Sequence, residues 1–440
     1  CNVNFKNNIV KISEETLMEF LSYVPDKIAL CGKKPEYDIE LDCNSSFLMG
    51  GAAAVSVLDL EGVYRKPNIK DLYDFTRLQD ALDNIHIICP MVIPQDVDPL
   101  ISELVMSAET LKNTWKNCDL WVHSAEEVKY QVKIAEAILG SDTVFQQRPI
   151  FTNCICLISP LLQPDDVLET MIESVKLGVP VYIEVDDMLG ATSPVTIAGT
   201  LVQQSANILP AIALAQMVKR GSPCIYSIAS AATEMHSMRY SAADPVTLLL
   251  HVATAQIAHF YGIPFNGGTG LDSKLPDIQA GYERGIQNFA CIAGGVNVVH
   301  LGAGMLEQMK LASFEQCIVD NEVQGMVKKF FEGFNIDQDT LAFEVIQNVF
   351  LMNKRSFLAE EHTLRYFKRN LWNFLITDKN DWNTWSTKGS KDCRQRAKEA
   401  TNKILKEHYP EVISEKVSKD ITEILTEARS KLLEKQPNKT

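Results

Sequence analysis

The residues that decide the fold are VYIEVDDMLGATSPVT, positions 181–196. They begin with an apolar, β-branched run at 181–185, which predicts a buried strand. A polar loop with a glycine follows, and Pro194 suits the first turn of a helix that we expect to start at Thr192 or Ser193. Strand, loop and helix in this order form one βα unit, the building block of a parallel sheet.

The same alternation recurs on both sides of this stretch. Short apolar runs, separated by helix-length segments, predict eight strands at 84–89, 119–123, 150–157, 181–185, 224–228, 264–266, 296–301 and 342–351. Eight strands match the closure of a (β/α)8 barrel, whereas a doubly wound sheet usually has fewer strands and a nucleotide-binding glycine loop after the first. We therefore predict an α/β fold, a TIM (β/α)8 barrel with an N-terminal extension and a C-terminal helical tail.

The segments outside the repeat set the expected domain boundaries. Residues 1–80 predict an N-terminal extension that caps one end of the barrel, with helices near 13–22 and from 69 and a strand-like stretch at 46–60. Residues 81–360 form the expected catalytic barrel. Residues 361–440 are rich in charge with apolar residues at helical spacing, and we favour a helical packing layer over a partner-binding role.

Composition narrows the functional classes. The formal net charge is −14, from 42 basic and 56 acidic side chains, which disfavours nucleic acid as a partner. The 11 cysteines are odd in number and scattered through apolar stretches, so we expect reduced thiols. The start of the sequence has no secretory pattern, and the apolar runs are interrupted before reaching about 18 residues. We therefore expect a cytoplasmic protein with no membrane partner.

Carboxylates follow the strand at 181–185, at the barrel end where reactive groups gather. Glu184, Asp186 and Asp187 could face a cationic ligand. Asp186 and Asp187 equally suit loop or helix-capping roles, whereas Glu184 is expected to point inward. We predict Glu184 as a catalytic residue.

A glycine-rich loop after the strand at 264–266 begins the most informative polar stretch of the chain. It lacks the spacing of phosphate-binding loops and of a complete dinucleotide-binding motif, which disfavours a nucleotide site. We predict that this stretch supplies substrate-binding residues, namely Phe265, Gly268, Asp272, Lys274, Gln279 and Tyr282.

Two histidines complete the candidate set. His300 ends the seventh strand and is either a substrate-binding residue or a hydrogen-bonded core residue. His362 stands near a predicted helix start beside acidic residues, and we predict it as catalytic, with a helix-capping role as the alternative. Cys154 and Cys156 share one face of a strand, but no matching Cys or His pair lies at zinc spacing, so we expect no metal.

Several stretches carry a family resemblance. They are KDL (70–72), MVIPQDV (91–97), GATSPVT (190–196), LVQQ (201–204), DSKLPDIQAGYE (272–283) and HTL (362–364). On these residues the chain resembles the trimethylamine methyltransferase family over almost its whole length, in the branch without pyrrolysine that includes glycine betaine:corrinoid methyltransferase. The resemblance implies a TIM barrel that methylates the Co(I) corrinoid (cobalamin) of a partner protein, within one-carbon metabolism. We also expect a homo-oligomer.

The substrate follows from one departure from the family pattern. Its trimethylamine enzymes carry pyrrolysine, and none of these 440 residues is pyrrolysine. The resemblance therefore implies a quaternary amine, glycine betaine or a related betaine, whose methyl group is already electrophilic. Aromatic faces bind such a cation, and Phe265, Tyr226 and Phe357 are candidates. The carboxylate of a betaine needs donors, which we expect from Lys274, His362 or the backbone amides at 267–270.

Other functions stay open at this point. The barrel could be a non-catalytic scaffold that binds amines or a corrinoid protein, because a fold does not establish chemistry. A pocket blocked by bulky side chains would favour that scaffold. The chain could also act on a simple methylamine, or it could be a metal-dependent hydrolase, which bound zinc would support.

Overall fold

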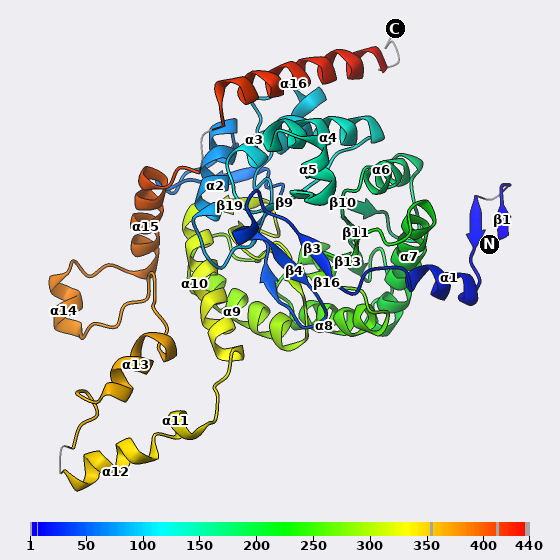
Figure 1. Ribbon diagram of the computed structural model, residues 1–440. Helices are drawn as coiled ribbons and strands as arrows, with labels where there is room; N and C mark the ends of the chain where they lie inside the picture. Colours follow the sequence, from blue (N-terminus) through cyan, green and yellow to red (C-terminus); the bar gives the residue numbers. More distant parts are fainter. Residues whose placement is uncertain (1, 7, 353–354, 411–412, 436–440) are drawn as a thin grey trace.

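The computed structural model describes residues 2–6, 8–352, 355–410 and 413–435. At its centre lies a sheet of eight parallel strands (Figure 1). A parallel bridge between Met49 and Ile87 joins the two edges of this sheet, so the predicted TIM (β/α)8 barrel is confirmed. In chain order the barrel strands are β5 (Phe47–Leu48), β8 (Ile87–Ile88), β9 (Asn117–Leu120), β10 (Phe151–Leu157), β11 (Val181–Val185), β13 (Cys224–Ile228), β16 (Phe265–Gly267) and β17 (Val298–Val299).

One major helix follows each barrel strand. Side chains at the helix starts accept backbone N–H groups, as Ser124 and Asp244 do, which satisfies donors that have no partner within the helix. The barrel helices are α2 (Ile69–Asp80), α3 (Ser102–Lys112), α4 (Ala125–Leu139), α6 (Asp165–Lys176), α7 (Ile197–Val218), α8 (Pro245–Phe260), α9 (Ile278–Ala293) and α10 (Phe314–Phe331); η2 (Pro99–Ile101) precedes α3, and α5 (Asp142–Gln147) follows α4.

One predicted barrel strand is wrong, and one barrel strand lies in the strand-like stretch at 46–60 that was assigned to the N-terminal extension. Residues 342–351 do not form the eighth strand, because Phe343–Leu351 is the helix α12. Its apolar residues also fit a helical period, and a short apolar run does not separate the two states. The barrel strand in the 46–60 stretch is β5, which is only two residues long.

The helix after β11 also starts later than predicted. α7 begins at Ile197 with Thr196 as its N-cap, and not at Thr192 or Ser193. The reason is that residues just before it form the short strand β12 (Met188–Leu189) and a turn. The polar loop is therefore longer than its sequence suggests.

The N-terminal segment closes one end of the barrel. It contains β1 (Asn2–Asn4), β2 (Ile9–Lys11), α1 (Glu14–Leu21), β3 (Ile28–Leu30), η1 (Pro35–Tyr37) and β4 (Ile39–Leu41). β3 and β4 form a hairpin whose Leu30 and Leu41 are buried in one cluster with Tyr182 and Ile225, near the amino-terminal ends of β11 and β13. The opposite end of the barrel carries two small sheets formed by β6 (Ser56–Leu58), β7 (Tyr64–Arg65), β18 (Met305–Leu306) and β19 (Leu311–Ser313), and by β12, β14 (Ala231–Glu234) and β15 (Arg239–Ser241).

The C-terminal region is helical, as predicted, but only part of it packs on the barrel. α15 (Cys393–Glu407) contacts α2 and α10, and α16 (Glu415–Lys435) contacts α3 and α4. By contrast, α11 (Gln338–Leu341), α12, α13 (Glu361–Asn370) and α14 (Trp382–Thr387) project away from the barrel (Figure 1).

One helix in the described part of the chain, α7, has the length and apolar composition of a membrane span. It contacts β11 and β13 from the outside of the barrel and lies between α6 and α8. Residues such as Ile208, Ile212 and Ala215 are fully buried there. These contacts explain its apolar character as that of a barrel helix.

Candidate active site

A pocket of about 360 Å³ opens at the carboxyl ends of the barrel strands. Its wall includes Asp119, Trp121, His123, Cys154, Cys156, Glu184, Asp186 and His300. A groove of about 560 Å³ on the outer wall, between α7 and α8, is larger but lies away from the strand ends. Because the reactive groups of such barrels stand at the carboxyl ends of the strands, the 360 Å³ pocket is the candidate active site.

The strand register sets polar residues side by side across the pocket floor. Cys156 on β10 pairs with Glu184 on β11, Glu184 with Ser227 on β13, and Ser227 with Asn266 on β16. The Asn266 Nδ2 atom donates to Ser227 Oγ at 2.8 Å, and Ser227 Oγ donates to Glu184 Oε2 at 2.5 Å. Glu184 is therefore held in a fixed orientation, pointing inward as predicted.

His300 completes this row. Asn266 Nδ2 also lies 2.9 Å from His300 Nδ1. An amide nitrogen only donates, so Nδ1 accepts and the ring proton resides on Nε2, which lies 3.6 Å from Glu184 Oε2. Burial lowers the pKa of His300 to about 4. At neutral pH the imidazole is uncharged, so His300 does not form an ion pair with Glu184.

The pocket acids resist ionisation. Burial raises the pKa of Glu184 and raises that of Asp119 well above its ordinary value. Burial, and then the neighbouring Glu184 charge, raise the pKa of Asp186 to about 7, although its side chain keeps an accessible surface toward the open pocket. None of the described residues that line this pocket is Lys or Arg. A bound cation would supply the missing charge and favour the ionised acids.

The described residues include one cluster that could hold a metal ion. Ligand atoms of Cys156, Glu184 and Asp186 all lie within 4.8 Å of one another. Burial and the nearby carboxylates raise the pKa of the Cys156 thiol, and a thiol must lose its proton before it binds a metal. We assign no metal to this cluster, and the expected absence of a metal stays a prediction.

His123 stands at the exposed rim of the pocket. Its Nε2 atom lies 3.3 Å from Glu103 Oε1, and this contact raises the pKa of His123. It is the basic side chain of the wall that gains positive charge most readily, since His300 is held neutral. Sequence reasoning missed His123, together with Asp119 and Trp121, although all three lie at or just beyond the end of β9.

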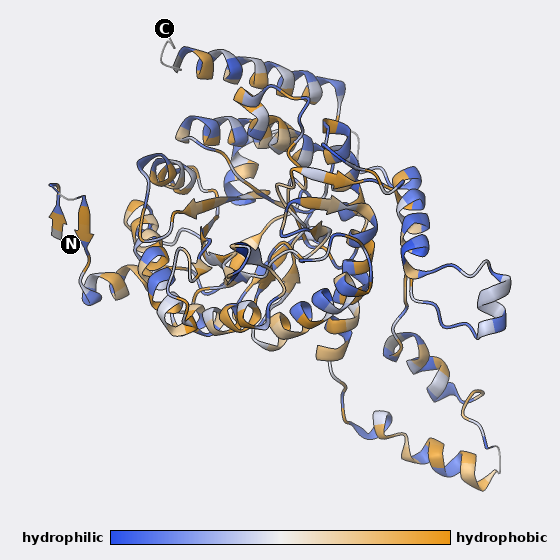
Figure 2. Ribbon diagram, turned by 180° about the vertical axis from the view of Figure 1, so that it is seen from behind, coloured by the Kyte–Doolittle hydropathy of each residue, from blue (hydrophilic) through white to orange (hydrophobic). Residues whose placement is uncertain are grey.

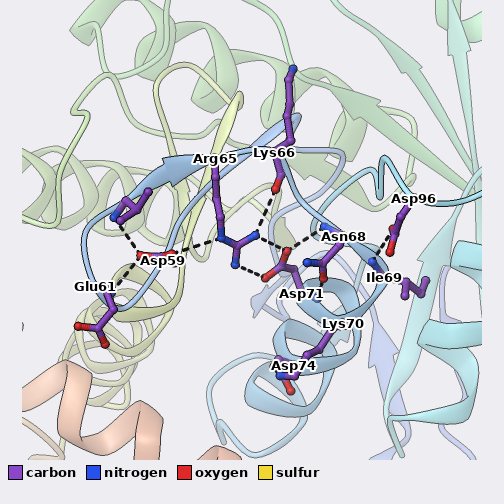
Figure 3. Close-up of polar contacts among 11 residues, drawn as sticks. Asp59, Glu61, Arg65, Lys66, Asn68, Ile69, Lys70, Asp71, Asp74 and Asp96 are labelled. Carbon is purple, nitrogen blue, oxygen red and sulfur yellow. Dashed lines mark hydrogen bonds and ion pairs between the residues drawn. The ribbon is translucent and has the colours of Figure 1, made fainter.

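An ion-pair network fixes the loop between β5 and α2 at the same barrel end. Arg65 donates to both carboxylate oxygens of Asp71, each at 2.7 Å (Figure 3). Asp71 also accepts the backbone N–H of Asn68 at 2.8 Å, and Asp96 accepts that of Ile69 at 2.9 Å. The KDL motif at 70–72 therefore starts a helix, and its aspartate does not face the pocket.

Two of the predicted site residues, Glu184 and His300, line the pocket. Phe265 is buried against Tyr226, with ring centroids 6.1 Å apart, so both rings lie in the core and neither lines the pocket. Gly268 has a φ of +136°, and a Cβ there would lie 2.8 Å from the carbonyl oxygen of His300. Only glycine allows this close approach beside His300.

The 272–283 stretch holds itself together outside the pocket. Asp272 accepts the backbone N–H groups of 242 and 243 at 3.2 and 3.0 Å. Glu283 accepts two further N–H groups, from Asp272 at 3.0 Å and its neighbour at 3.1 Å, and Gln279 donates to it at 2.7 Å. Lys274 and Tyr282 are exposed. The structure does not bring these predicted residues to the pocket wall.

His362 and Phe357 lie far from the barrel strands. They were expected after an eighth strand at 342–351, and that strand is a helix of the projecting region. The His362 ring packs on Tyr366 at a centroid distance of 4.6 Å, and its Nε2 lies 3.1 Å from the carbonyl oxygen of Asp339. Neither residue lines the pocket of its own chain.

Comparisons with known proteins identify the family of this chain. The family model described as trimethylamine methyltransferase (MTTB) matches residues 1–432. Trimethylamine methyltransferase MttB of Desulfitobacterium hafniense (strain DSM 10664 / DCB-2) is 32% identical over 428 residues, 97% of this chain and 85% of that protein. Glycine betaine methyltransferase of Desulfitobacterium hafniense (strain Y51) is 31% identical over 410 residues, 93% of this chain and 85% of that protein.

A solved structure supports the fold. The monomethylamine methyltransferase (MtmB) of Methanosarcina barkeri aligns with a TM-score of 0.55 at 11% identity, covering 99% of this chain and 83% of that one. This likeness concerns the fold, whereas the sequence relatives carry the family assignment. The chain belongs to the trimethylamine methyltransferase family and is a methyltransferase.

Proposed function

We propose that this methyltransferase takes a methyl group from a quaternary amine, glycine betaine or a related betaine, and transfers it to the Co(I) corrinoid of a partner protein in the cytoplasm. The observation that carries the proposal is the composition of the pocket wall. It joins four carboxyl groups, Asp119, Asp166, Glu184 and Asp186, to the indole of Trp121, without Lys or Arg among its described residues. Carboxylates and an aromatic face are the groups that bind a permanent cation.

The proposed reaction is a single displacement. The Co(I) centre attacks the methyl carbon, the cobalt–carbon bond forms as the carbon–nitrogen bond breaks, and the electron pair of that bond stays on nitrogen. A neutral tertiary amine leaves, and no proton has to move. The protein therefore works by positioning the methyl group and excluding water.

Each pocket group has a proposed part in this positioning. Glu184, oriented by Ser227 and neutral His300, faces the ammonium group together with Asp186. Trp121 offers the aromatic surface. His123 at the rim, whose pKa is raised, becomes the candidate donor to the carboxylate of a betaine. It takes the place of Lys274 and His362, which lie outside the pocket.

The test mixes the purified chain with Co(I) cobalamin, or with its corrinoid protein, and follows methyl-Co(III) by absorbance. Glycine betaine, proline betaine, carnitine, γ-butyrobetaine and trimethylamine are compared as donors. We expect transfer from at least one quaternary amine and none from trimethylamine. If no quaternary amine in the panel donates a methyl group, the proposal is rejected.

A second candidate is methyl transfer from trimethylamine itself. The relative from strain DCB-2, named a trimethylamine methyltransferase, is as similar to this chain as the glycine betaine relative. Transfer from trimethylamine alone in the same panel would establish this candidate and reject the first.

A further inference from the structure

A projecting segment carries an unusual amount of exposed apolar surface. We define the arm as residues 333–352 and 355–371, which follow α10 and contain α11, α12 and α13 (Figure 1). Phe334, Phe350 and Leu358 expose 86%, 81% and 89% of their surface. Colouring by hydropathy shows that α12 is largely apolar (Figure 2).

The helices of the arm are too short to be stable without a packing surface. α11, α12 and α13 have 4, 9 and 10 residues. Isolated helices below about 12 to 15 residues are marginal in water. On α12, Phe343, Ile346 and Phe350 recur at helical spacing, and all three are exposed. Such an apolar face is typical of a helix that packs against another surface, and the described part of this chain provides no such surface for α12.

The exposed area is that of a stable interface. Five phenylalanines of the arm are exposed, which at about 200 Å² for each ring and its observed exposure gives roughly 700 Å². The aliphatic side chains add to this. A standard interface buries about 800 Å² on each partner, whereas the largest apolar patch of a monomer measures about 300 to 600 Å².

A second apolar surface begins where the arm leaves the barrel. We define the stripe as Ile286 and Phe289 of α9 with Met326 and Phe330 of α10, all of which are exposed. The rings of Phe289 and Phe330 lie 5.5 Å apart, so the two helices contribute to one surface. The chain's own arm does not cover it. One chain thus presents both an unpartnered apolar arm and an unpartnered apolar wall.

The position of the arm argues against the methyl acceptor as its partner. That acceptor has to reach the pocket at the carboxyl ends of the strands. α10 runs from this end toward the opposite one, and the arm leaves from its last turn. The arm returns at Trp372, which packs on Gly325 beside Asn84, just before β8. Both ends of the arm therefore lie away from the pocket mouth.

We propose that the arm packs on the stripe of a second copy of this chain. If two copies exchange arms reciprocally, the same pair of surfaces is used twice and the assembly closes. Each copy then covers the apolar face of α12 and the exposed rings of α9 and α10. The proposal concerns assembly and holds for any methyl donor.

The test measures the mass of the full chain by light scattering after gel filtration at micromolar concentration. We expect a mass of at least two chains, each of 49.2 kDa. An arm variant, Phe343→Glu with Phe350→Glu, and a stripe variant, Phe289→Glu with Phe330→Glu, should each run as a monomer. The matched control, Val202→Glu with Leu249→Glu, changes exposed apolar residues of α7 and α8 and should keep the wild-type mass.

Mixing the two variants sharpens the test. The arm variant keeps an intact stripe and the stripe variant an intact arm, so the mixture should regain a two-chain species that neither forms alone. Circular dichroism checks that each variant is folded. A monomeric wild-type chain, an arm variant of wild-type mass, or a monomer that assembles only with the corrinoid protein would each overturn the proposal.

Discussion

Two groups of acids lie at the same barrel end and differ in what surrounds them. In the 272–283 stretch, Asp272 and Glu283 each accept two backbone N–H groups. In the pocket, Glu184 accepts from one hydroxyl and from the Cys154 thiol at 3.6 Å, and Asp186 accepts one backbone N–H at 3.2 Å and the Cys156 thiol at 3.7 Å. A thiol is a weak donor. The first group is saturated with donors, and the second has room for a ligand.

This difference distinguishes a motif that is held by its own hydrogen bonds from a group of pocket acids with fewer donors. Buried carboxylates are stable when enough donors compensate their charge. The pocket acids lack this compensation, and their pKa values are raised accordingly. The longest family motif in the sequence is therefore held by its own hydrogen bonds, and the pocket acids with fewer donors stand in a shorter, less distinctive stretch.

The largest expected effect is that of Glu184→Gln, which tests whether the pocket acids bind the cation. Removing a buried charge that faces a cation costs about 2 to 4 kcal/mol, which corresponds to a loss of roughly 30- to 1000-fold in affinity for the quaternary amine. Ser227 can still donate to the amide oxygen, so the fold should persist. Isothermal titration with methyl-transfer kinetics measures the loss. A change below about threefold would contradict the assignment of Glu184.

The next effect is a pH dependence. Because the pKa of Asp186 is raised to about 7, its carboxyl group is protonated below that pH and must lose a proton to attract a cation. Affinity should fall by up to about tenfold per pH unit below pH 7 and level off above it. Asp186→Asn should remove this slope. A slope that persists in the variant would assign the titration to another group of the pocket.

A smaller effect is expected at Trp121. Replacing the indole by leucine keeps apolar surface but removes the aromatic face, a loss of about 0.5 to 2 kcal/mol or roughly 2- to 30-fold in affinity. A neutral analogue, with carbon in place of the quaternary nitrogen, serves as control and should bind both proteins alike. Equal losses for the charged and neutral ligands would show that Trp121 only packs.

Glu283→Gln is the matched change in the other group of acids. It should lower the free energy of unfolding by about 1 to 3 kcal/mol, because the backbone N–H groups of Asp272 and Ser273 lose a charged acceptor. Affinity for the amine should change much less than in Glu184→Gln. Urea unfolding and titration on the same sample measure both. A hundredfold loss of affinity with unchanged stability would show instead that Glu283 takes part in binding the amine.

The smallest effect is expected for Lys274→Ala. Its Nζ atom donates to the carbonyl oxygen of Asp272 at 2.7 Å on the exposed side of the loop. Turnover and affinity should stay within about twofold of wild type, since isolated surface contacts contribute less than about 1 kcal/mol. If KM rises strongly for a betaine but not for a quaternary amine without a carboxylate, Lys274 binds the carboxylate of the betaine.

Much of the barrel could be predicted because strand and helix alternate with clear periods. The strands β11 and β13 have the predicted bounds. β5 falls within the strand-like stretch expected at 46–60, but its place in the barrel could not be predicted, because it is two residues long and its pairing partners lie far along the chain. α12 was mistaken for a strand because its environment, and not its composition, decides between the two states.

The site was predictable only where one residue carried its own signal. Glu184 interrupts an apolar strand, and His300 ends another, so both stood out. Asp119 lies in β9 and Trp121 directly follows it, and their proximity to Glu184 depends on strand register, which no local pattern reveals. His362 was misplaced because its expected position relied on the wrong eighth strand.

The pairing of β5 with β17 has a consequence for synthesis of the chain. Phe47 pairs with Val298, so the ring of strands cannot be completed until residue 298 has left the ribosome. Until then the emerging protein is an open ribbon with two bare edges, which other chains could join. A chaperone that shields those edges should therefore raise the yield of this enzyme more than it does for proteins whose sheets do not require the first strand to pair with the last.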